Sequence, residues 1–308
     1  MRGINFAQRR PDTSLFTMDS KDSLPFHVVI DNCIFQGVDS NDPTAAVVYL
    51  NSPKLTASIS HTTFQTNKVA LGALAIITTG GNITLNAVQF SDNIGLQATG
   101  VAGFNLVMTN SSLLAIDLLL ENNTNPGMGS AMVIVSTQSS SNFTNLSVKH
   151  NIAETNPVSV SLILNDTFYM TGSSFVNNTA NATSGGALGA NIATGCSFII
   201  EGSAFNANQA VTDAGAMEVV NTGGSVTITQ TTFANNTGGN QGGAVRLSNS
   251  DSSITNVTNC NFNNNTGISG GALASFSNHW ALTNVIDVVF INNHANSGGA
   301  LYTDVTDQ

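Results

Sequence analysis

The chain has 308 residues, of which only 8% are charged, and its formal net charge at pH 7 is −10. The chain has only eight lysines and arginines in total, too few for the basic stripe that binds phosphate groups. We therefore expect that it binds neither nucleic acid nor anionic membranes. Solubility must come from uncharged polar side chains, and asparagine alone accounts for 40 residues.

Residues 1–24 are a basic, unpatterned start that carries Arg2, Arg9 and Arg10. No run of seven or more apolar residues follows these arginines, so the segment does not fit a secretory signal peptide. Nowhere does the chain approach the run of about eighteen apolar residues that a transmembrane helix needs. We therefore expect an N-terminal non-repeat segment over 1–24 and no direct membrane span in this segment of sequence.

From residue 25 onward the sequence is periodic. An apolar anchor recurs every 26 to 30 residues, and an asparagine stands three positions after every anchor but the first. The anchors are Phe35, Phe64, Phe90, Leu119, Val148, Phe175, Phe205, Phe233, Phe262 and Phe290. The asparagines are Asn67, Asn93, Asn122, Asn151, Asn178, Asn208, Asn236, Asn265 and Asn293. A period of this size, held along the chain, predicts a repeat architecture.

A patch of small residues that ends in an aliphatic residue follows most anchors by eight to eleven positions. Clear copies lie at 72–74, 185–188, 215–217, 242–245, 270–273 and 298–301, with a looser copy at 129–132. Apolar residues also alternate over short runs, as at Val226, Ile228 and Phe233. Alternation is typical of strands with one buried face, while Gly and Asn interrupt every window long enough for a helix.

A unit of about 28 residues that holds two or three short strands cannot bury its apolar face alone, whereas stacked units bury it between them. We therefore predict an all-β, single-domain parallel β-helix of about ten coils over residues 25–308. Parallel crossovers are right-handed in about 98% of cases, so we expect a right-handed solenoid. Because coils stack about 4.8 Å apart, the asparagines should lie above one another and form a hydrogen-bonded ladder of amides.

The three cysteines do not predict a disulfide framework. Cys33 and Cys260 each stand two positions before an anchor, so alternation turns both inward. Eight coils separate them, roughly 38 Å, which is far beyond the reach of a disulfide. Cys196 lies elsewhere on its coil, and we expect three buried free thiols that act as small apolar residues.

The sequence offers no set of catalytic residues. Glycoside hydrolysis needs carboxylates that converge on one patch, and elimination needs a base beside a bound cation. Glu218 and Arg246 occupy the same offset in neighbouring coils, so we interpret them as a cross-strand ion pair on the surface. We therefore predict that the chain is not an enzyme and has no catalytic residue.

The sequence also carries no pattern typical of a metal-binding or cofactor-binding site. His27, His61, His150, His279 and His294 are scattered, without the His or Cys spacing of a zinc site. We therefore expect no metal site, no cofactor-binding site and no cofactor. The single tryptophan, Trp280, follows His279 and leaves two alternatives: stacking on a sugar or a partner, or packing on a corner of its coil, which we expect.

The two motifs, Phe-X-X-Asn and Gly-Gly-Ala-(Leu/Val), alternate in register over about residues 35–301 and most densely from Phe175 onward. Together they resemble the polymorphic outer membrane protein repeat of chlamydial autotransporter passengers. The resemblance implies a passenger-like domain displayed at the cell surface, in the outer membrane if the organism is bacterial. It also implies adhesion to a protein or glycan on another cell and self-association.

Three functions remain open on the sequence. The expected one is a non-enzymatic, extracellular solenoid that serves as an adhesin or surface-display scaffold. The alternative is a structural subunit of an extracellular filament that assembles by end-to-end stacking. A polysaccharide-active enzyme is the third, and three or more outward carboxylates across adjacent coils would favour it.

Overall fold

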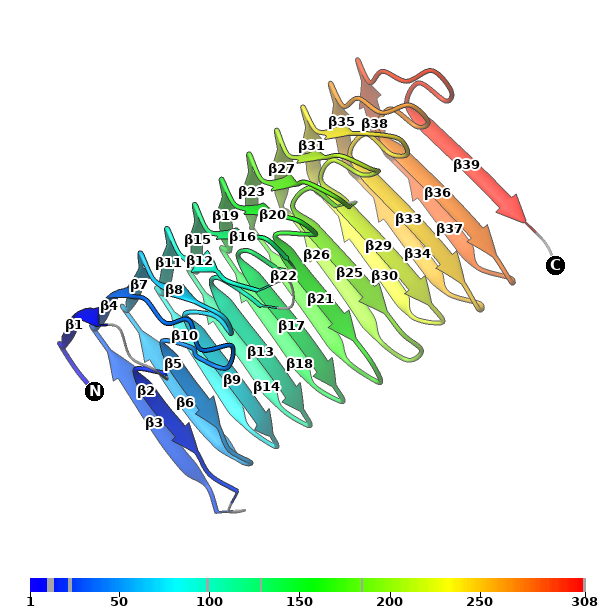
Figure 1. The fold of residues 1–308 in the computed structure, drawn as a ribbon. Helices are drawn as coiled ribbons and strands as arrows, with labels where there is room; N and C mark the ends of the chain where they lie inside the picture. The colour runs from blue at the N-terminus through cyan, green and yellow to red at the C-terminus, as the bar shows by residue number, and fades with distance from the viewer. Residues whose placement is uncertain (10–13, 22–23, 98–99, 128, 184, 307–308) are drawn as a thin grey trace.

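The fold is a parallel β-solenoid of about ten turns, in a computed structural model that describes residues 1–9, 14–21, 24–97, 100–127, 129–183 and 185–306. Strands and the loops between them make up these described residues, which contain no helix. The chain rises steadily from β1 to β39, so the two ends lie at opposite ends of the stack (Figure 1). The expected fold class is confirmed.

The strands form four parallel sheets: two have eleven strands, one has ten, and one has seven and spans only the coils from β8 to β32. The anchor sheet contains β1 (Asn5–Arg9), β4 (Ile34–Val38), β7 (Thr63–Gln65), β11 (Gln89–Ser91), β15 (Leu119–Glu121), β19 (Ser147–Lys149), β23 (Ser174–Val176), β27 (Ala204–Asn206), β31 (Thr232–Ala234), β35 (Asn261–Asn263) and β38 (Val289–Ile291). The corner sheet follows it along the chain and contains β8 (Lys68–Val69), β12 (Ile94–Gly95), β16 (Thr124–Asn125), β20 (Ile152–Ala153), β24 (Thr179–Ala180), β28 (Gln209–Ala210) and β32 (Thr237–Gly238).

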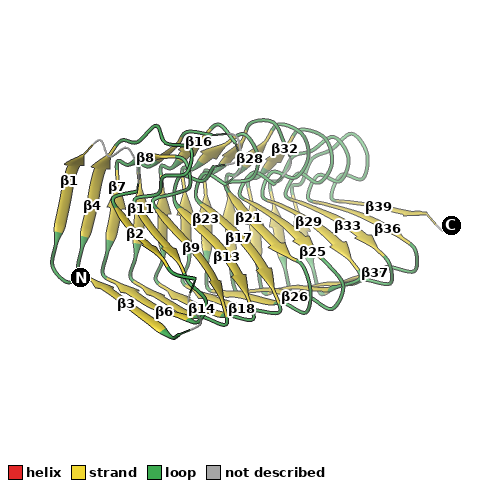
Figure 2. Cartoon of the chain, turned by 60° about the horizontal axis from the view of Figure 1, so that its bottom comes forward, coloured by secondary structure: helices red, strands yellow, loops and turns green. Residues whose placement is uncertain are grey.

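The two longer sheets form the other sides of the coil. The return sheet contains β2 (Phe16–Asp19), β5 (Val48–Asn51), β9 (Leu74–Thr79), β13 (Phe104–Thr109), β17 (Met132–Thr137), β21 (Val158–Leu162), β25 (Leu188–Ile192), β29 (Met217–Thr222), β33 (Val245–Ser250), β36 (Leu273–Asn278) and β39 (Leu301–Thr306). The ten-stranded sheet contains β3 (Phe26–Asp31), β6 (Leu55–Ser60), β10 (Asn82–Asn86), β14 (Ser112–Ile116), β18 (Ser140–Thr144), β22 (Thr167–Thr171), β26 (Ser197–Glu201), β30 (Ser225–Thr229), β34 (Ile254–Thr258) and β37 (Leu282–Ile286). Loops between the corner and return sheets gather along one long edge (Figure 2).

The apolar anchors form one column through the core. Phe233 is fully buried, and its ring lies 5.1 Å from the ring of Phe205 and 4.7 Å from that of Phe262, as the repeat predicts. In the fourth coil the column passes through Leu120, which pairs with Phe90 and Val148, whereas Leu119 points outward. The anchor assigned to Leu119 is therefore wrong by one residue.

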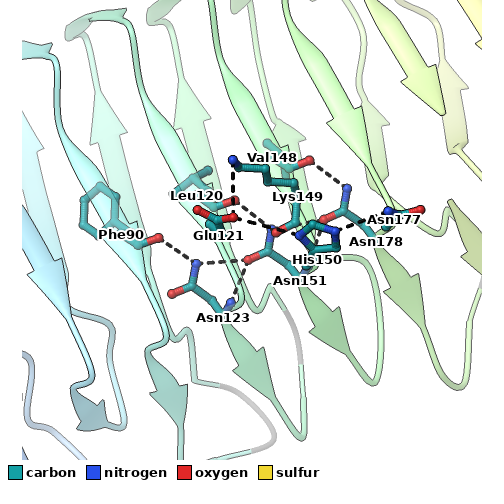
Figure 3. A network of polar contacts seen from close by, with 10 residues as sticks. All are labelled: Phe90, Leu120, Glu121, Asn123, Val148, Lys149, His150, Asn151, Asn177 and Asn178. Carbon is teal, nitrogen blue, oxygen red and sulfur yellow. Dashed lines mark hydrogen bonds and ion pairs between the residues drawn. The ribbon is translucent and has the colours of Figure 1, made fainter. Parts of the chain in front are cut away.

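The predicted amide ladder is present, with one correction. The Nδ2 of Asn123 donates to Oδ1 of Asn151 at 3.0 Å, and Nδ2 of Asn151 donates to Oδ1 of Asn178 at 3.0 Å (Figure 3). The second hydrogen of each amide goes to the carbonyl of the anchor in the preceding coil, as from Asn151 to Leu120 at 2.9 Å. Asn122 was assigned to this ladder but occupies the preceding corner position, with a φ of 54°.

The sequence of this coil fits the repeat in two registers that differ by one residue. Both Leu119 with Asn122 and Leu120 with Asn123 satisfy the spacing of three, because the sequence repeats leucine and asparagine there. Burial distinguishes them, since Asn123 is fully buried and Asn122 is exposed. The corner position before the ladder is left-handed in every coil from Thr66 to Asn292, and asparagine tolerates that backbone well.

The stacking starts earlier than residue 25. Within the segment 1–24, which we expected to lie outside the repeat, β1 pairs with β4 and β2 pairs with β5. The ring of Phe6 stacks on that of Phe35 at 5.0 Å and so extends the anchor column by one coil. Arg10, part of the basic start, lies outside the described residues.

The small-residue patches are needed where neighbouring coils approach most closely. A Cβ on Gly243 would lie 2.1 Å from the carbonyl oxygen of Gly271 in the next coil, a distance that no side chain permits. Gly242 before it has a φ of +68°, which favours glycine as well. The glycine pairs thus let the loop-rich edge stack at the same spacing as the sheets.

All three cysteines are free and buried, as expected. Burial raises the pKa of the Cys196 and Cys260 thiols, so both stay protonated at neutral pH. Among the described residues no helix is long and apolar enough to cross a membrane.

Candidate functional site

Only outward positions and loops are available for binding, because the core fills the inside of every coil. On the return sheet the outward residues of successive coils lie in rows set by the strand register. In β17, β21 and β25 these rows hold uncharged aliphatic, hydroxyl and amide residues, among them Val133, Ser159 and Asn191. In β33, β36 and β39 they instead hold Arg246, Phe276, Tyr302 and Asp304.

Arg246 is held by four neighbours. Its Nη1 donates to Oε1 of Glu218 at 2.7 Å, and its Nε donates to Oε1 of Gln241 at 3.1 Å. Oδ2 of Asp213 lies 3.7 Å from the same Nε. The guanidinium carbon lies 5.2 Å from the centre of the Phe276 ring, a cation–π distance. Two carboxylates therefore surround one cation, and the group as a whole carries net negative charge.

The predicted cross-strand pair is confirmed, since Glu218 and Arg246 are register partners in β29 and β33. It is, however, more enclosed than a simple surface pair. Only 22% of the Arg246 side chain and 21% of the Glu218 side chain are accessible to solvent. The additional contacts fix the guanidinium in one position, so its role is to shape the surface around it.

A cavity of about 280 Å³ opens beside this guanidinium. Its polar lining consists of Arg246, Ser248, Asn249, Ser250, Ser277, Asn278, Asp304 and Thr306. The Phe276 ring and Val220 supply the apolar part of the lining. The ring of Tyr302 packs against Phe276 at a centroid distance of 5.7 Å and an angle of 45°. The cavity thus combines hydroxyl and amide groups with one apolar wall, and its only charged groups are the guanidinium and a carboxylate.

A buried polar network supports the floor of the cavity. Asn249, which lines the cavity, donates to Oγ1 of Thr283 at 2.8 Å and accepts from Oγ1 of Thr255 at 2.7 Å. Ser275 and Ser277 also contact Oγ1 of Thr283, at 3.0 and 3.2 Å. Because these groups satisfy one another, the lining is held in a single arrangement rather than left free to repack.

Trp280 lies on the turn between β36 and β37, two residues after the cavity residue Asn278. It is 83% exposed, so our expectation that it packs on a corner of its coil is wrong. Its φ of 63° and that of His279 before it, 47°, are both left-handed. The ring of His279 contacts Asp251 of the preceding coil at 3.3 Å, which anchors the turn and leaves the indole in solvent.

A second polar cluster lies on the anchor sheet (Figure 3). Oε1 of Glu121 lies 3.3 Å from Nζ of Lys149 and 4.0 Å from Nδ1 of His150, whose Nε2 contacts Asn177 at 3.2 Å. One carboxylate faces one ammonium, with no second carboxylate in the cluster. Such partly exposed pairs contribute about 0–1 kcal/mol, and we assign this cluster to the lateral stabilisation of adjacent coils.

The structure keeps the other candidate residues apart. His27 lies in β3, while His61, His150, His279 and His294 follow β6, β19, β36 and β38, and His61 contacts Asp31 at 3.3 Å. Hydrogen bonds from Ser60, followed by those from His61 and Arg2, lower the pKa of Asp31. Within the described part of the chain, no three His, Cys, Asp or Glu side chains lie close enough together to hold a metal ion.

Sequence reasoning missed the cavity. Its one visible signal is Phe276, an aromatic residue at an outward position between two inward serines. The partners of that ring, Arg246 and Tyr302, come from the two neighbouring strands β33 and β39, and only the stacking register brings them together.

Comparison with known proteins adds one finding. The model of the Chlamydia polymorphic membrane protein (Chlamydia_PMP) repeat matches residues 287–304, which contain Phe290, Asn293 and the Gly-Gly-Ala-Leu patch. No curated protein and no solved structure matches the chain. The chain is thus similar to this repeat over its last complete copy of the two motifs, and most of the earlier coils carry the same motifs in the same register.

Proposed function

We propose that the chain is a non-enzymatic scaffold displayed at the cell surface, where it binds a component of another cell in the manner of an adhesin. One observation carries the proposal: a rigid, regular stack bears a well-held cluster of polar and aromatic side chains on its outside, around Arg246 and Phe276. The matched repeat supports the surface location, since its description is that of a membrane protein family.

The chemistry of the cluster favours binding over turnover. A glycosidase of the usual kind needs one carboxyl group as acid and another as base or nucleophile. Here Asp213 and Glu218 both neutralise Arg246, and Asp304 lies on a separate strand at the far side of the Phe276 ring. We therefore expect no hydrolysis or elimination with pectin-like, alginate-like or chitin-like polymers. Turnover that disappears when one carboxylate is replaced would contradict the proposal.

Surface display can be tested directly. An antibody against the folded chain should label intact cells of the organism that produces it, with no increase after permeabilisation. Beads coated with the protein should then attach to partner cells, and soluble protein should compete for that attachment. Labelling that requires permeabilisation would refute the surface location, and attachment without competition would refute the adhesive role.

A further inference from the structure

We propose that the cavity beside Arg246, together with the indole of Trp280, is a binding site for a neutral saccharide. The inference rests on the proposed function and names the class of ligand for it. It starts from the charges of the site. Glu218 and Asp213 already neutralise Arg246, and Asp304 adds a further negative charge. An anionic sugar would therefore meet net repulsion, from the site and from a chain of net charge −10.

The remaining lining matches sugar hydroxyl groups. Ser248, Ser250 and Thr306 each present a hydroxyl that donates one hydrogen bond and accepts others, and Asn278 adds an amide with both functions. A saccharide hydroxyl has the same double character, so it pairs with such groups without burying a charge. A cationic ligand could use Asp304 alone, and it would lie beside the guanidinium of Arg246.

Aromatic rings provide the second half of the recognition. Pyranose rings have faces made of C–H groups, which pack on aromatic surfaces, and small-molecule sites combine apolar walls with a few placed polar groups. Phe276 supplies such a wall inside the cavity, and its position is fixed between Arg246 and Tyr302. Trp280, only two residues from Asn278, offers the largest exposed aromatic surface of the chain.

The size and rigidity of the cavity limit the ligand. Its volume, about 280 Å³, is just below the range of small-molecule sites, which span about 300–1,000 Å³. It therefore holds one or two sugar units, and the rest of a chain would run across the exposed indole. The network of Asn249, Thr255 and Thr283 behind the cavity keeps the site formed without ligand.

The single tryptophan makes the test direct. We would titrate the purified chain with neutral hexasaccharides (cellohexaose, maltohexaose, mannohexaose and chitohexaose) and record the tryptophan emission. At least one should shift the emission to shorter wavelength with a saturable dependence on concentration below about 5 mM. Hexagalacturonate and hexalysine serve as the anionic and cationic probes. No saturable shift with any neutral probe, or stronger binding of hexalysine, would overturn the proposal.

Variants separate this site from the rest of the surface. By calorimetry, Trp280→Ala and Ser248→Ala should each weaken binding of the best probe at least tenfold, whereas Ile77→Ala should leave it unchanged. Ile77 is exposed on the same sheet in a distant coil, so it controls for general effects of the surface. Circular dichroism and melting temperature confirm folding, and equal affinity in all three variants would overturn the site.

Failure of this inference differs from failure of the proposed function. If Trp280→Ala binds no saccharide but its beads still attach to cells, adhesion uses another surface and this site does not carry it. If hexasaccharides bind while intact cells are not labelled by the antibody, the saccharide site stands and the surface role falls.

Discussion

At the scale of single residues, the ladder asparagines are held because every hydrogen-bonding group of the amide is used. Oδ1 of Asn236 accepts from both the backbone nitrogen and Nδ2 of Asn208, each at 3.0 Å. Its Nδ2 donates to Oδ1 of Asn265 and to the carbonyl of Phe205, also at 3.0 Å. No other side chain of this size offers two acceptor and two donor sites in that geometry.

Asn236→Asp is therefore expected to destabilise the stack by about 1–3 kcal/mol, the usual cost of an unsatisfied buried partner. The new carboxylate oxygen would face two acceptors, Asn265 and Phe205, and this raises its pKa above that of the unfolded chain. The loss of unfolding free energy therefore grows as the pH rises from the pKa of the introduced carboxyl group in the unfolded chain to its higher pKa in the folded chain. The melting temperature of the variant should consequently be lower at pH 8 than at pH 5.

Asn235→Asp is the matched control, because Asn235 precedes the ladder at an exposed corner and Asp tolerates its φ of 55°. We expect it to melt close to the parent at both pH values. If Asn236→Asp also melts like the parent at pH 5 and 8, the column does not act as a ladder.

Phe233 tests the anchor column in the same way. Removing its ring leaves a cavity between Phe205 and Phe262, so Phe233→Ala should cost about 3–5 kcal/mol of unfolding free energy in urea titrations. Phe233→Leu should cost about 1.5 kcal/mol or less, because the column accepts leucine at Leu120. A cost well below about 3 kcal/mol for Phe233→Ala would show that ring packing does not stabilise the column.

At the scale of elements, the features shared by all repeats could be predicted from the sequence, whereas the features of single coils could not. The columns of Phe and Asn follow from periodicity, because each coil must place the same group above the last. In the fourth coil the doubled residues Leu119-Leu120 and Asn122-Asn123 fit two registers, and only burial selects one. The first strands, β1 and β2, lack both the ladder asparagine and the glycine patch, so their pattern was too weak to recognise.

The candidate site was less predictable for a related reason. The cross-strand pair Glu218–Arg246 could be predicted, because the two residues occupy the same position within neighbouring repeats. The exposure of Trp280 and the cavity beside Phe276 depend on turn geometry and on side chains from several coils. No periodic signal encodes them, since outward positions are those that the repeat leaves free.

The elements also differ in how apolar their inward faces are. β26 turns Phe198 and Ile200 inward, whereas β34 turns Thr255 and Val257 inward beside buried Asn249. In a stack where stability is a sum of local terms, a more polar core lowers local stability. We therefore expect amides of β34 to exchange hydrogen faster than those of β26 in mass spectrometry.

Thr255→Val supplies the control for this prediction. It should not slow exchange, because it removes partners from Asn249 and Asn221 and leaves their polar groups unsatisfied. Exchange in β34 as slow as in β26 would show that the polar network stabilises its coils as well as an apolar core does.

At the scale of the whole molecule, parallel stacking has no intrinsic end. In the last described coil the Phe290 ring is half-buried and Leu301 is 36% exposed, whereas their counterparts Phe262 and Leu273 are fully buried by the next coil. The edges of β38 and β39 present backbone groups ready to pair with another strand (Figure 1). A further coil of the same kind or a second copy of the chain can cover them.

A chain of these 308 residues should therefore associate as its concentration rises, by burial of Phe290 and Leu301 against a neighbour. Sedimentation over a hundredfold range of concentration should show the mass increasing. Leu301→Lys places a charge at an inward position of the edge strand and should abolish association. Leu282→Lys, in the same coil but on an outward position, should not. A monomer at every concentration, or equal effects of the two lysines, would show that this edge does not pair.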